Sequence, residues 1–387
     1  MIYLDNSATT KQHALVTERM ITCMEETYGN PSSLHRMGLE AERMVKQARR
    51  EVSEAAGFPG AQIVFTSGGT EADNMAIFGA AKAGRRRGSR IVTSAVEHPA
   101  VLESCAALEQ EGFEVIRVGV DDQGRPDLAA TEAAINDQTI LVTMMQVNNE
   151  VGTIFPIDAL AQIIEDRQAP ALLHCDAVQS FGKIPLPQKA DLISISGHKI
   201  HGPKGSGALL MRKGLQIPAY IHGGGQEKGF RSGTENVPAI AGLGLACSLC
   251  MNDRKERMEN IAALRNRLLE GLREEIPDIL LNSPQAAGEE AGDCCGSLLN
   301  VSFLGTRGEV LLHSLEQEGI CVSTGSACSS NKKGRSHVLQ AMGRSEREIE
   351  GAIRFSLSGY NTKEEIEETV EKTAAVVQRF RRLGSFR

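Results

Sequence analysis

The sequence lacks a run of apolar residues long enough to cross a lipid bilayer. Its longest apolar stretch, residues 238–251, is short and interrupted by glycine, whereas a membrane-spanning helix needs about 20 apolar residues. The first residues predict a strand that begins at Ile2 rather than a secretory signal peptide. We therefore expect no membrane partner and a cytoplasmic location.

The sequence also lacks an excess of positive charge. Lysine and arginine number 42 against 49 aspartates and glutamates, which gives a net charge of −7 and a pI near 5.8. The short basic runs at residues 85–87 and 379–382 are therefore interpreted as solvated helix ends. We expect no direct nucleic-acid partner.

No pair of cysteines has the spacing of a zinc ribbon. The nine cysteines are an odd number, and without a secretion signal they indicate reduced thiols. Cys247 and Cys250 form a C-x-x-C inside an apolar run, which favours core packing over redox or metal chemistry. Cys294 and Cys295 lie in a glycine-rich connection. Their adjacency is interpreted as having no function, and binding of a soft metal is the alternative. We expect no resident metal.

Apolar runs and amphipathic segments alternate along the chain. Strands are predicted near residues 62–66, 90–94, 113–118, 139–145, 171–175, 191–195, 206–211, 298–303 and 352–357. Helices are predicted near residues 34–57, 70–83, 99–111, 127–136, 158–167, 235–274, 308–318 and 363–382. Two capping boxes, Ser345 with Glu348 and Thr362 with Glu365, predict helix starts. The alternation predicts an α/β fold with a mostly parallel sheet covered on both faces, followed by a second, smaller unit.

Lys199 lies just beyond the apolar strand at 191–195, in the turn Ser196-Gly-His-Lys-Ile-His-Gly-Pro-Lys-Gly205. Burial at the end of such a strand disfavours the charged form of an amine, which is what a Schiff-base lysine requires. Ser196 and His198 are donors suited to a phosphate, and glycines let the backbone approach a ligand closely. The alternative for this stretch alone is a solvated surface turn.

Two further strand ends carry matching chemistry. Asp176 follows the strand at 171–175, where a carboxylate can hold a proton on the pyridine nitrogen of pyridoxal 5'-phosphate (PLP). The turn Thr66-Ser-Gly-Gly69 precedes a helix that begins at Thr70, and a helix start of this kind is a ready phosphate site. Since ligands of open α/β sheets bind at the carboxyl ends of the strands, these stretches together indicate a PLP site.

With these motifs the sequence resembles the cysteine desulfurases, which belong to the class V aminotransferase group of fold-type I PLP enzymes. The matching stretches run in order over residues 3–10, 66–71, 97–98, 147–150, 176–179, 196–205, 222–227, 231–234, 323–328 and 353–356. Two positions depart from the pattern. His201 stands where relatives often carry Tyr, and Cys175 stands where Val is frequent.

The resemblance implies the fold and the assembly. It implies a fold-type I PLP-dependent transferase in which residues 15–255 form a large PLP-binding domain. Residues 1–14 and 256–387 would form a small α+β domain that carries the catalytic cysteine loop. It also implies a homodimer with composite active sites.

The resemblance further implies a role for each site residue. Lys199 would hold PLP covalently, Asp176 would pair with the pyridine nitrogen, Gln179 would bond the ring phenolic oxygen, and His98 would stack on the ring. Gly69, Thr70, Ser196 and His198 would hold the phosphate with Thr234 from a second subunit, and Asn149 and Arg354 would bind the substrate carboxylate. His98 could instead be only a helix-start residue before Pro99, and Arg354 a structural salt-bridge residue.

Cys328 is the residue that separates desulfuration from transamination. It lies in the small, polar and basic stretch 324–335, which predicts a mobile loop whose positive charges favour a thiolate. The resemblance implies that it removes sulfur from L-cysteine as a persulfide, leaving L-alanine. Cys321 is expected to be buried, and a nonspecific surface thiol is the alternative for Cys328.

The length of that loop resembles the long-loop branch of the family. Its members pass sulfur to an acceptor protein in iron–sulfur cluster assembly or in tRNA thiolation, and the sequence leaves both acceptors open. Preference for cysteine or selenocysteine is also open. The competing hypotheses are another class V activity, namely an aminotransferase or selenocysteine lyase, and a non-catalytic sulfur- or metal-handling scaffold.

Overall fold

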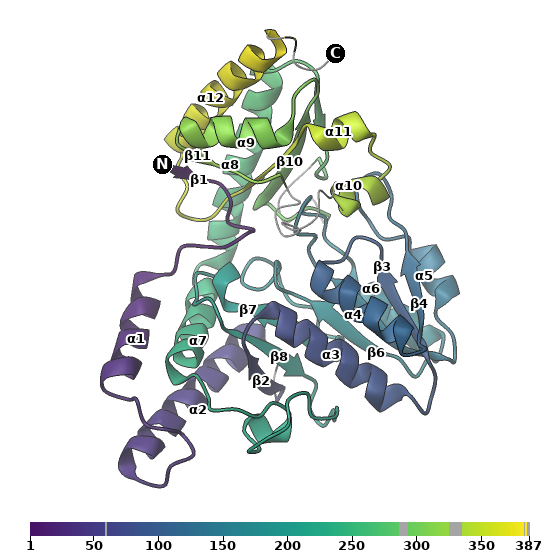
Figure 1. The fold of residues 1–387 in the computed structure, drawn as a ribbon, viewed down its shortest axis with the longest axis vertical. Coiled ribbons are helices and arrows are strands. Elements are labelled where there is room, and N and C mark those ends of the chain that lie inside the picture. Colours follow the sequence, from purple (N-terminus) through teal and green to yellow (C-terminus); the bar gives the residue numbers. More distant parts are fainter. Residues whose placement is uncertain (59, 286–292, 325–334, 383, 385–387) are drawn as a thin grey trace.

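The computed structural model describes residues 1–58, 60–285, 293–324, 335–382 and 384 (Figure 1). Its strands are β1 Ile2–Tyr3, β2 Gln62–Thr66, β3 Arg90–Ser94, β4 Glu114–Val118, β5 Thr139–Met145, β6 Leu172–Asp176, β7 Leu192–Ser196, β8 Gly207–Met211, β9 Ile279–Leu281, β10 Leu298–Phe303, β11 Ile320–Cys321 and β12 Ala352–Ser356. Its helices are α1 Ala14–Glu25, α2 Arg36–Ala56, α3 Gly69–Gly84, α4 Pro99–Gln110, α5 Leu128–Ala134, α6 Ile157–Asp166, α7 Val237–Met251, α8 Arg254–Glu275, α9 Gly308–Gln317, α10 His337–Ala341, α11 Glu346–Glu350 and α12 Lys363–Arg382, with 3-10 turns η1 Gly197–Lys199 and η2 Glu227–Gly229.

The central element is a seven-stranded sheet with the order β2-β8-β7-β6-β5-β3-β4. Strands β7, β6, β5, β3 and β4 run parallel to one another, while β8 runs antiparallel to both β2 and β7. The prediction of an α/β fold with a mostly parallel sheet is therefore confirmed.

Side chains of one strand alternate between two apolar layers, because successive residues point to opposite faces of a sheet. In β2, Ile63 and Phe65 pack in one cluster with residues of α2, α6 and α7. Val64 packs in the other cluster with residues of α3 and α4. Helices thus cover both faces, as the near-continuous apolar strands predict.

Helix α2 forms as its sequence predicts. Its apolar stripe of Ala41, Val45, Ala48 and Val52 is buried, and Gly57 ends the helix in the left-handed conformation at φ 60°. The stripe packs closely on α7, where a Cβ at Gly244 would lie 2.6 Å from the Cα of Ala48. Glycine at this position allows the two helices to approach.

The helical region expected at 235–274 is two helices rather than one. Asp253 adopts a positive φ of 48° between α7 and α8 and so interrupts the helix. Helix α1 and strand β9 were not predicted. The capping box of Ser345 and Glu348 is confirmed, and reciprocal hydrogen bonds between Thr362 and Glu365 confirm the other.

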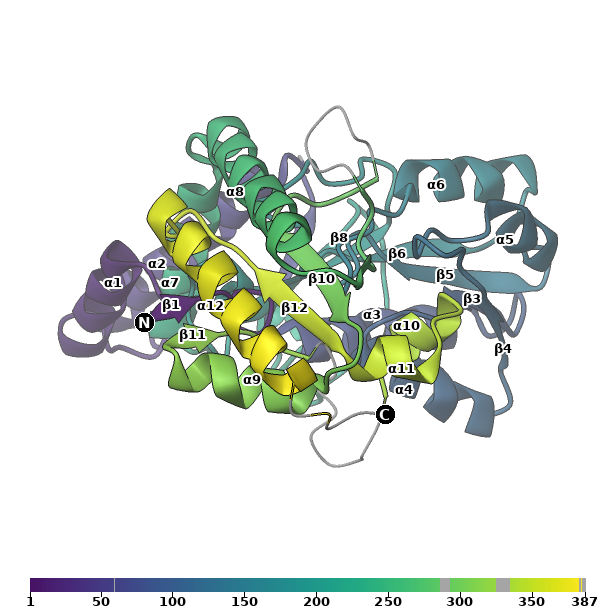
Figure 2. The same cartoon turned by 90° about the horizontal axis from the view of Figure 1, so that it is seen from above.

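A smaller antiparallel sheet, β12-β10-β9, lies beside the central sheet and is covered by α8 and α12 (Figure 2). Near it, β1 pairs in parallel with β11. From β1 the chain descends to α1 beside the large sheet (Figure 1). The segment between them, residues 4–13, therefore passes close to the carboxyl ends of the central strands.

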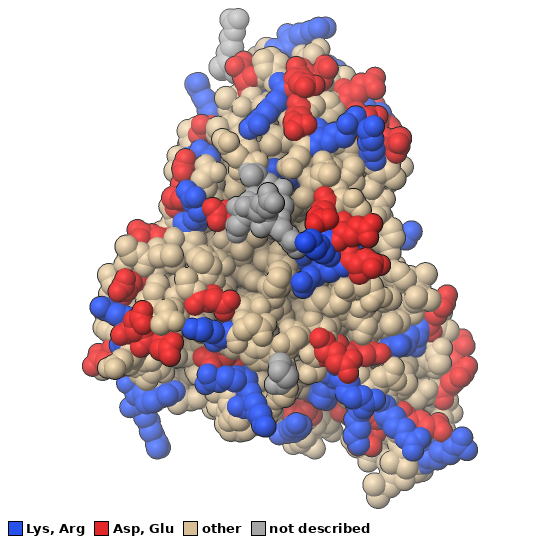
Figure 3. Space-filling model, turned by 180° about the vertical axis from the view of Figure 1, so that it is seen from behind, with Lys and Arg blue, Asp and Glu red and all other residues tan. Residues whose placement is uncertain are grey.

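The surface carries both signs of charge. On the face shown in Figure 3, lysine and arginine are interspersed with aspartate and glutamate rather than gathered in one patch. Among the described residues, no helix is both long and apolar enough to cross a membrane. In the same part of the chain, no three His, Cys, Asp or Glu side chains are placed to hold a metal ion.

Candidate active site

A cavity of about 190 Å³ lies at the carboxyl ends of the central strands. It brings together ten of the twelve predicted site residues: Gly69, Thr70, His98, Asn149, Asp176, Gln179, Ser196, His198, Lys199 and Arg354. Thr234 is exposed and does not line this cavity in the single chain. Cys328 lies outside the described residues.

The amine of Lys199 points at the N-terminal segment. It donates hydrogen bonds to the carbonyl oxygens of Ser7 and Ala8, the latter at 2.8 Å. Turn η1, which follows β7, delivers the lysine to this position. Backbone carbonyls carry no residue-type signal, so the sequence motifs alone could not identify them as partners of the lysine.

Asp176 ends β6 with its carboxyl group buried. Burial raises its pKa to about 6, although a hydrogen bond from Val178 N at 2.9 Å and the charge of Lys199 act in the opposite direction. A cationic partner at this carboxylate would lower the pKa again, because opposite charge favours the ionised form. The site is therefore suited to a protonated ring nitrogen.

Three buried titratable residues near Asp176 received no role from the sequence, namely Asp73, Glu97 and His174. Asp73 lies 3.6 Å from Nε2 of His174, and Glu97 accepts a hydrogen bond from Met145 N at 2.8 Å. Burial and then the charge of Asp176 raise the pKa of Asp73, and burial is also the main cause of the raised pKa of Glu97. The only available signal was an acid on an otherwise apolar helix stripe or strand end.

His98 caps a helix and also lines the cavity, while its stacking on the ring stays a prediction. Its Nδ1 accepts a hydrogen bond from Ala100 N at 3.1 Å, so it caps α4, and its ring also lines the cavity. Burial, followed by the charges of Lys199 and His337, lowers its pKa to about 4. The imidazole is thus neutral at pH 7, with its proton on Nε2.

Donors for an anion gather where α3 begins. Gly68 precedes this helix and offers no side-chain cap, so N–H groups of the first turn are left for a ligand. A Cβ at Gly69 would lie 2.6 Å from Cγ2 of Val178 and 3.5 Å from Cβ of Ser196. Because only glycine fits, the helix start lies close to Ser196, whose buried Oγ has no hydrogen-bond partner among the described residues.

His198 lies beside these donors with Nδ1 3.2 Å from Oγ1 of Thr9. Burial is the main cause that lowers its pKa to about 4, and the charges of Lys199 and Lys204 add to the effect. The side chain is therefore a neutral hydrogen-bonding group at pH 7.

Arg354 is buried in β12 and pairs with Asp5 at 2.9 Å, so the structural alternative for it holds in part. Its Nη1 donates to the carbonyl oxygen of Asn149 at 3.0 Å. Its Nε is buried and has no hydrogen-bond partner in the described part of the chain. The side chain of Arg354 also lines the cavity.

Gln179 connects the cavity to the N-terminal segment. Its Nε2 donates to the carbonyl oxygen of Ser7 at 3.0 Å, and its Oε1 accepts from Lys183 at 3.1 Å. The carbonyl of Ser7 is therefore shared by Gln179 and Lys199.

The other thiols of the described chain do not match a nucleophile. Cys247 and Cys250 are buried in the large core, which confirms core packing, and burial raises the pKa of Cys250 to about 12. Cys321 is only partly buried, contrary to expectation, because β11 is a two-residue edge strand. Burial still raises its pKa.

The family model for class-V aminotransferases matches residues 2–369. The chain belongs to this family. It is 43% identical to a protein of Nostoc sp. named cysteine desulfurase, over all of this chain and 95% of that protein. It is also 43% identical to a protein of Methanosarcina thermophila named cysteine desulfurase IscS, over 99% of this chain and 93% of that protein.

Solved structures agree with these relatives. A structure titled NifS-like protein superposes with a TM-score of 0.90 at 38% identity, covering 98% of this chain and 99% of that one. A structure titled SspA in complex with cysteine gives a TM-score of 0.79 at 32% identity, covering 94% and 100%. The fold is that of fold-type I PLP enzymes, and this chain is a PLP-dependent enzyme.

The residues present fit that cofactor. The unpartnered Oγ of Ser196 and the uncapped start of α3 suit a phosphate, and the close approach at Gly69 leaves room for only a hydrogen there. The buried carboxyl group of Asp176 lines the same cavity, together with the amine of Lys199. An aldehyde, a basic ring nitrogen and a phosphate each have a partner of the right chemistry.

Proposed function

We propose that the protein is a cysteine desulfurase that converts L-cysteine to L-alanine and retains the sulfur as a persulfide on Cys328. The observation that carries this proposal is one cavity that joins Lys199, Asp176 and Arg354 from three separated parts of the chain. The full-length similarity to proteins named cysteine desulfurase supports the choice of substrate.

PLP would supply an electron-withdrawing ring that weakens bonds at the carbon attached to the substrate amine. Lys199, whose amine donates to the carbonyls of Ser7 and Ala8, would hold it covalently. Asp176 would keep the ring nitrogen protonated. Gln179 would bond the phenolic oxygen, and neutral His98 would lie against the ring with its proton on Nε2.

At the other end of the cavity, Gly69, Thr70, Ser196 and His198 would bind the phosphate. Asn149 and Arg354, which both line the cavity, would bind the substrate carboxylate. The pairing of Arg354 with Asp5 fixes the plane of the guanidinium during this contact.

Cys328 would act as the nucleophile. Its thiolate forms a bond to the substrate sulfur while the carbon–sulfur bond breaks, and the carbon then takes a proton to give alanine. The outer sulfur of the persulfide would pass to an acceptor protein for iron–sulfur cluster assembly or tRNA thiolation. We place this activity in the cytoplasm, in a homodimer in which Thr234 of the partner subunit completes the phosphate site.

The test is the product balance of purified holoenzyme with L-cysteine. Wild type is expected to form one alanine for each sulfide released in the presence of a reducing thiol. Cys328→Ser is expected to keep the yellow cofactor but to form neither alanine nor persulfide, and Lys199→Ala is expected to lose turnover. Cys321→Ser is the matched control and is expected to stay active. Sulfide release by Cys328→Ser at the wild-type rate would assign the chemistry to another group.

A further inference from the structure

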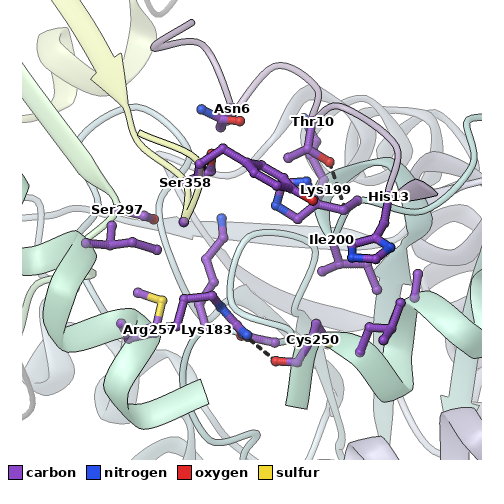
Figure 4. A pocket seen from close by; sticks show the side chains of 18 of the residues that line it. Asn6, Thr10, His13, Lys183, Lys199, Ile200, Cys250, Arg257, Ser297 and Ser358 are labelled. Carbon is purple, nitrogen blue, oxygen red and sulfur yellow. Dashed lines mark hydrogen bonds between the residues drawn. The ribbon is translucent and has the colours of Figure 1, made fainter. Parts of the chain in front are cut away.

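A second cavity of about 360 Å³ is lined in part by Lys199 (Figure 4). Its walls come from the N-terminal segment, turn η1, the end of α7, the start of α8 and the loop after β12. The size falls within the range of pockets that bind small organic molecules. None of the roles proposed above uses this space, except that Lys199 lines both cavities.

The charge of this cavity has one sign. Lys183, Lys199 and Arg257 line it, and no aspartate or glutamate is among its described lining residues. Figure 4 shows the side chain of Lys183 extending into the cavity. Within the described chain, neither Lys183 nor Arg257 forms a salt bridge, and the carboxylate that acts on Arg257, Asp253, does not line the cavity.

The hydrogen bonds of these two cations go to neutral oxygens. Arg257 donates to the backbone carbonyls of Asn252 at 2.8 Å, Gly182 at 3.0 Å and Cys250, and Lys183 donates to Oε1 of Gln179 at 3.1 Å. Burial is the main cause that lowers the pKa of Lys183. An ammonium has three donors, so Lys183 can bond an anion while it keeps Gln179.

The remaining walls are largely apolar. They include Phe181, Ile200, Ala246 and Ile261, all buried. On the loop after β12, Tyr360 is 55% exposed and packs edge-on against His201, with ring centroids 5.1 Å apart. The cavity thus combines a cationic floor with an apolar body.

We propose that this cavity is a second binding site, separate from the catalytic one, for a small organic carboxylate with an apolar body. The carboxylate forms an ion pair with the ammonium of Lys183 and is attracted by the positive charge of Arg257. The apolar part lies against Phe181, Ile200 and Ile261. A carboxylate beside Lys183 favours the charged form of this partly buried amine.

The site is coupled to the catalytic cavity by hydrogen bonds. Lys183 bonds Gln179, which bonds the carbonyl of Ser7, and that carbonyl accepts from Lys199. A carboxylate on Lys183 therefore acts on the same segment that orients the catalytic lysine. Binding itself requires no turnover, so it is measured independently of the desulfurase activity.

The test is isothermal titration calorimetry of the holoenzyme with two probes of equal shape, 2-naphthoate and the neutral 2-naphthamide. Wild type is expected to bind the carboxylate at least tenfold more tightly than the amide. Lys183→Met is expected to remove this preference, and Lys183→Arg to restore most of it. Equal affinity of both probes for wild type would overturn the proposal.

Two control variants separate this site from the catalytic cavity and from misfolding. Asn149→Ala removes a proposed substrate contact and is expected to leave naphthoate affinity within twofold; loss of binding here would place the probe in the catalytic cavity. Leu249→Trp fills the second cavity from its apolar wall and is expected to abolish binding. If Lys183→Met loses its cofactor or its cooperative thermal transition, the test rests on the Leu249→Trp variant. Unchanged naphthoate binding in that variant would contradict the proposal.

Discussion

The amine of Lys199 sets the electrostatics of its neighbours before any ligand binds. Its charge lowers the pKa of His98 and of His198, and it partly offsets the effect of burial on Asp176. Burial is the main cause that keeps the two histidines neutral, and the charge of Lys199 adds to it, while the same charge favours ionisation of the Asp176 carboxyl group. This pattern prepares the site for a cofactor with one positive end and one negative end.

We predict that His98 of the apoprotein does not titrate between pH 5.5 and 8. Its pKa is lowered from 6.5 to about 4, mainly by burial, so the ring takes up its proton only as the pH falls toward 4. The measurement is the pH dependence of its imidazole carbon and proton shifts by NMR.

Lys199→Ala supplies the control for this prediction. Removal of the ammonium is expected to move the midpoint of His98 upward, toward but not to 6.5, since burial remains. A midpoint near 6.5 in the wild-type apoprotein would show that the ring is not buried as described.

At the level of elements, one ion pair joins three parts of the large sheet region. Glu227 of η2 accepts two hydrogen bonds at 2.9 Å from Arg49 of α2 and one at 3.0 Å from Phe65 N of β2. The side chain of Glu227 is 3% exposed and that of Arg49 is 26% exposed. Removal of the carboxylate would leave a partly buried guanidinium and a buried N–H without this partner.

We predict that Glu227→Ala lowers the free energy of unfolding by about 2–3 kcal/mol. This is below the usual cost of breaking a fully buried pair, because Arg49 keeps some contact with water. Glu114→Ala breaks a surface pair with Arg90 in which the glutamate is 49% exposed, so it is expected to cost less than about 1 kcal/mol. Urea unfolding of both variants is the measurement, and equal losses would contradict the argument.

The elements that could be predicted from the sequence are those whose pattern of apolar side chains indicates which face is buried. The strands of the central sheet are short apolar runs between polar turns, so their type and place were recoverable. Helix α1 was not, because it buries only Val16 and Cys23 and shows little stripe. The break at Asp253 depends on backbone conformation, which residue type indicates poorly outside glycine.

The residues of the candidate site that could be predicted are likewise those whose place follows from an apolar strand. Lys199 and Asp176 stand directly after predicted strands, so their shared position followed from the sheet. Asp73 and Glu97 are buried acids whose burial is decided by tertiary packing. The carbonyls of Ser7 and Ala8 belong to the backbone, and the folding of the chain alone places them on the lysine.

At the scale of the whole molecule, we predict a homodimer. Helix α1 leaves Leu15, Ile21 and Met24 between 44% and 53% exposed, and Thr234 is exposed away from the cavity it is proposed to complete in the partner. Light scattering at micromolar concentration should give about 83 kDa, twice the 41.7 kDa of one chain. A species of one chain mass with full activity would exclude shared sites.

We also propose the division into a large domain, residues 15–255, and a small domain of residues 1–14 and 256–387. The separate apolar cluster around β10 and β12 supports it, and this cluster contains Ile2 and Leu4. Helix α10 reaches the other way, since Val338 and Leu339 pack in the large core. The small domain is thus anchored on the large one.

The path of the first residues has a consequence for the order of events during synthesis. Ile2 pairs with Ile320, and the side chain of Asn6 bonds the carbonyl of Ser356, 350 residues away. Such distant contacts are slow to form, and on the ribosome the opening segment waits until almost the whole chain has emerged. The carbonyls of Ser7 and Ala8 belong to that segment, so we expect Lys199 to gain their hydrogen bonds only late in synthesis. The first residues to be synthesised are therefore expected to be among the last to fold.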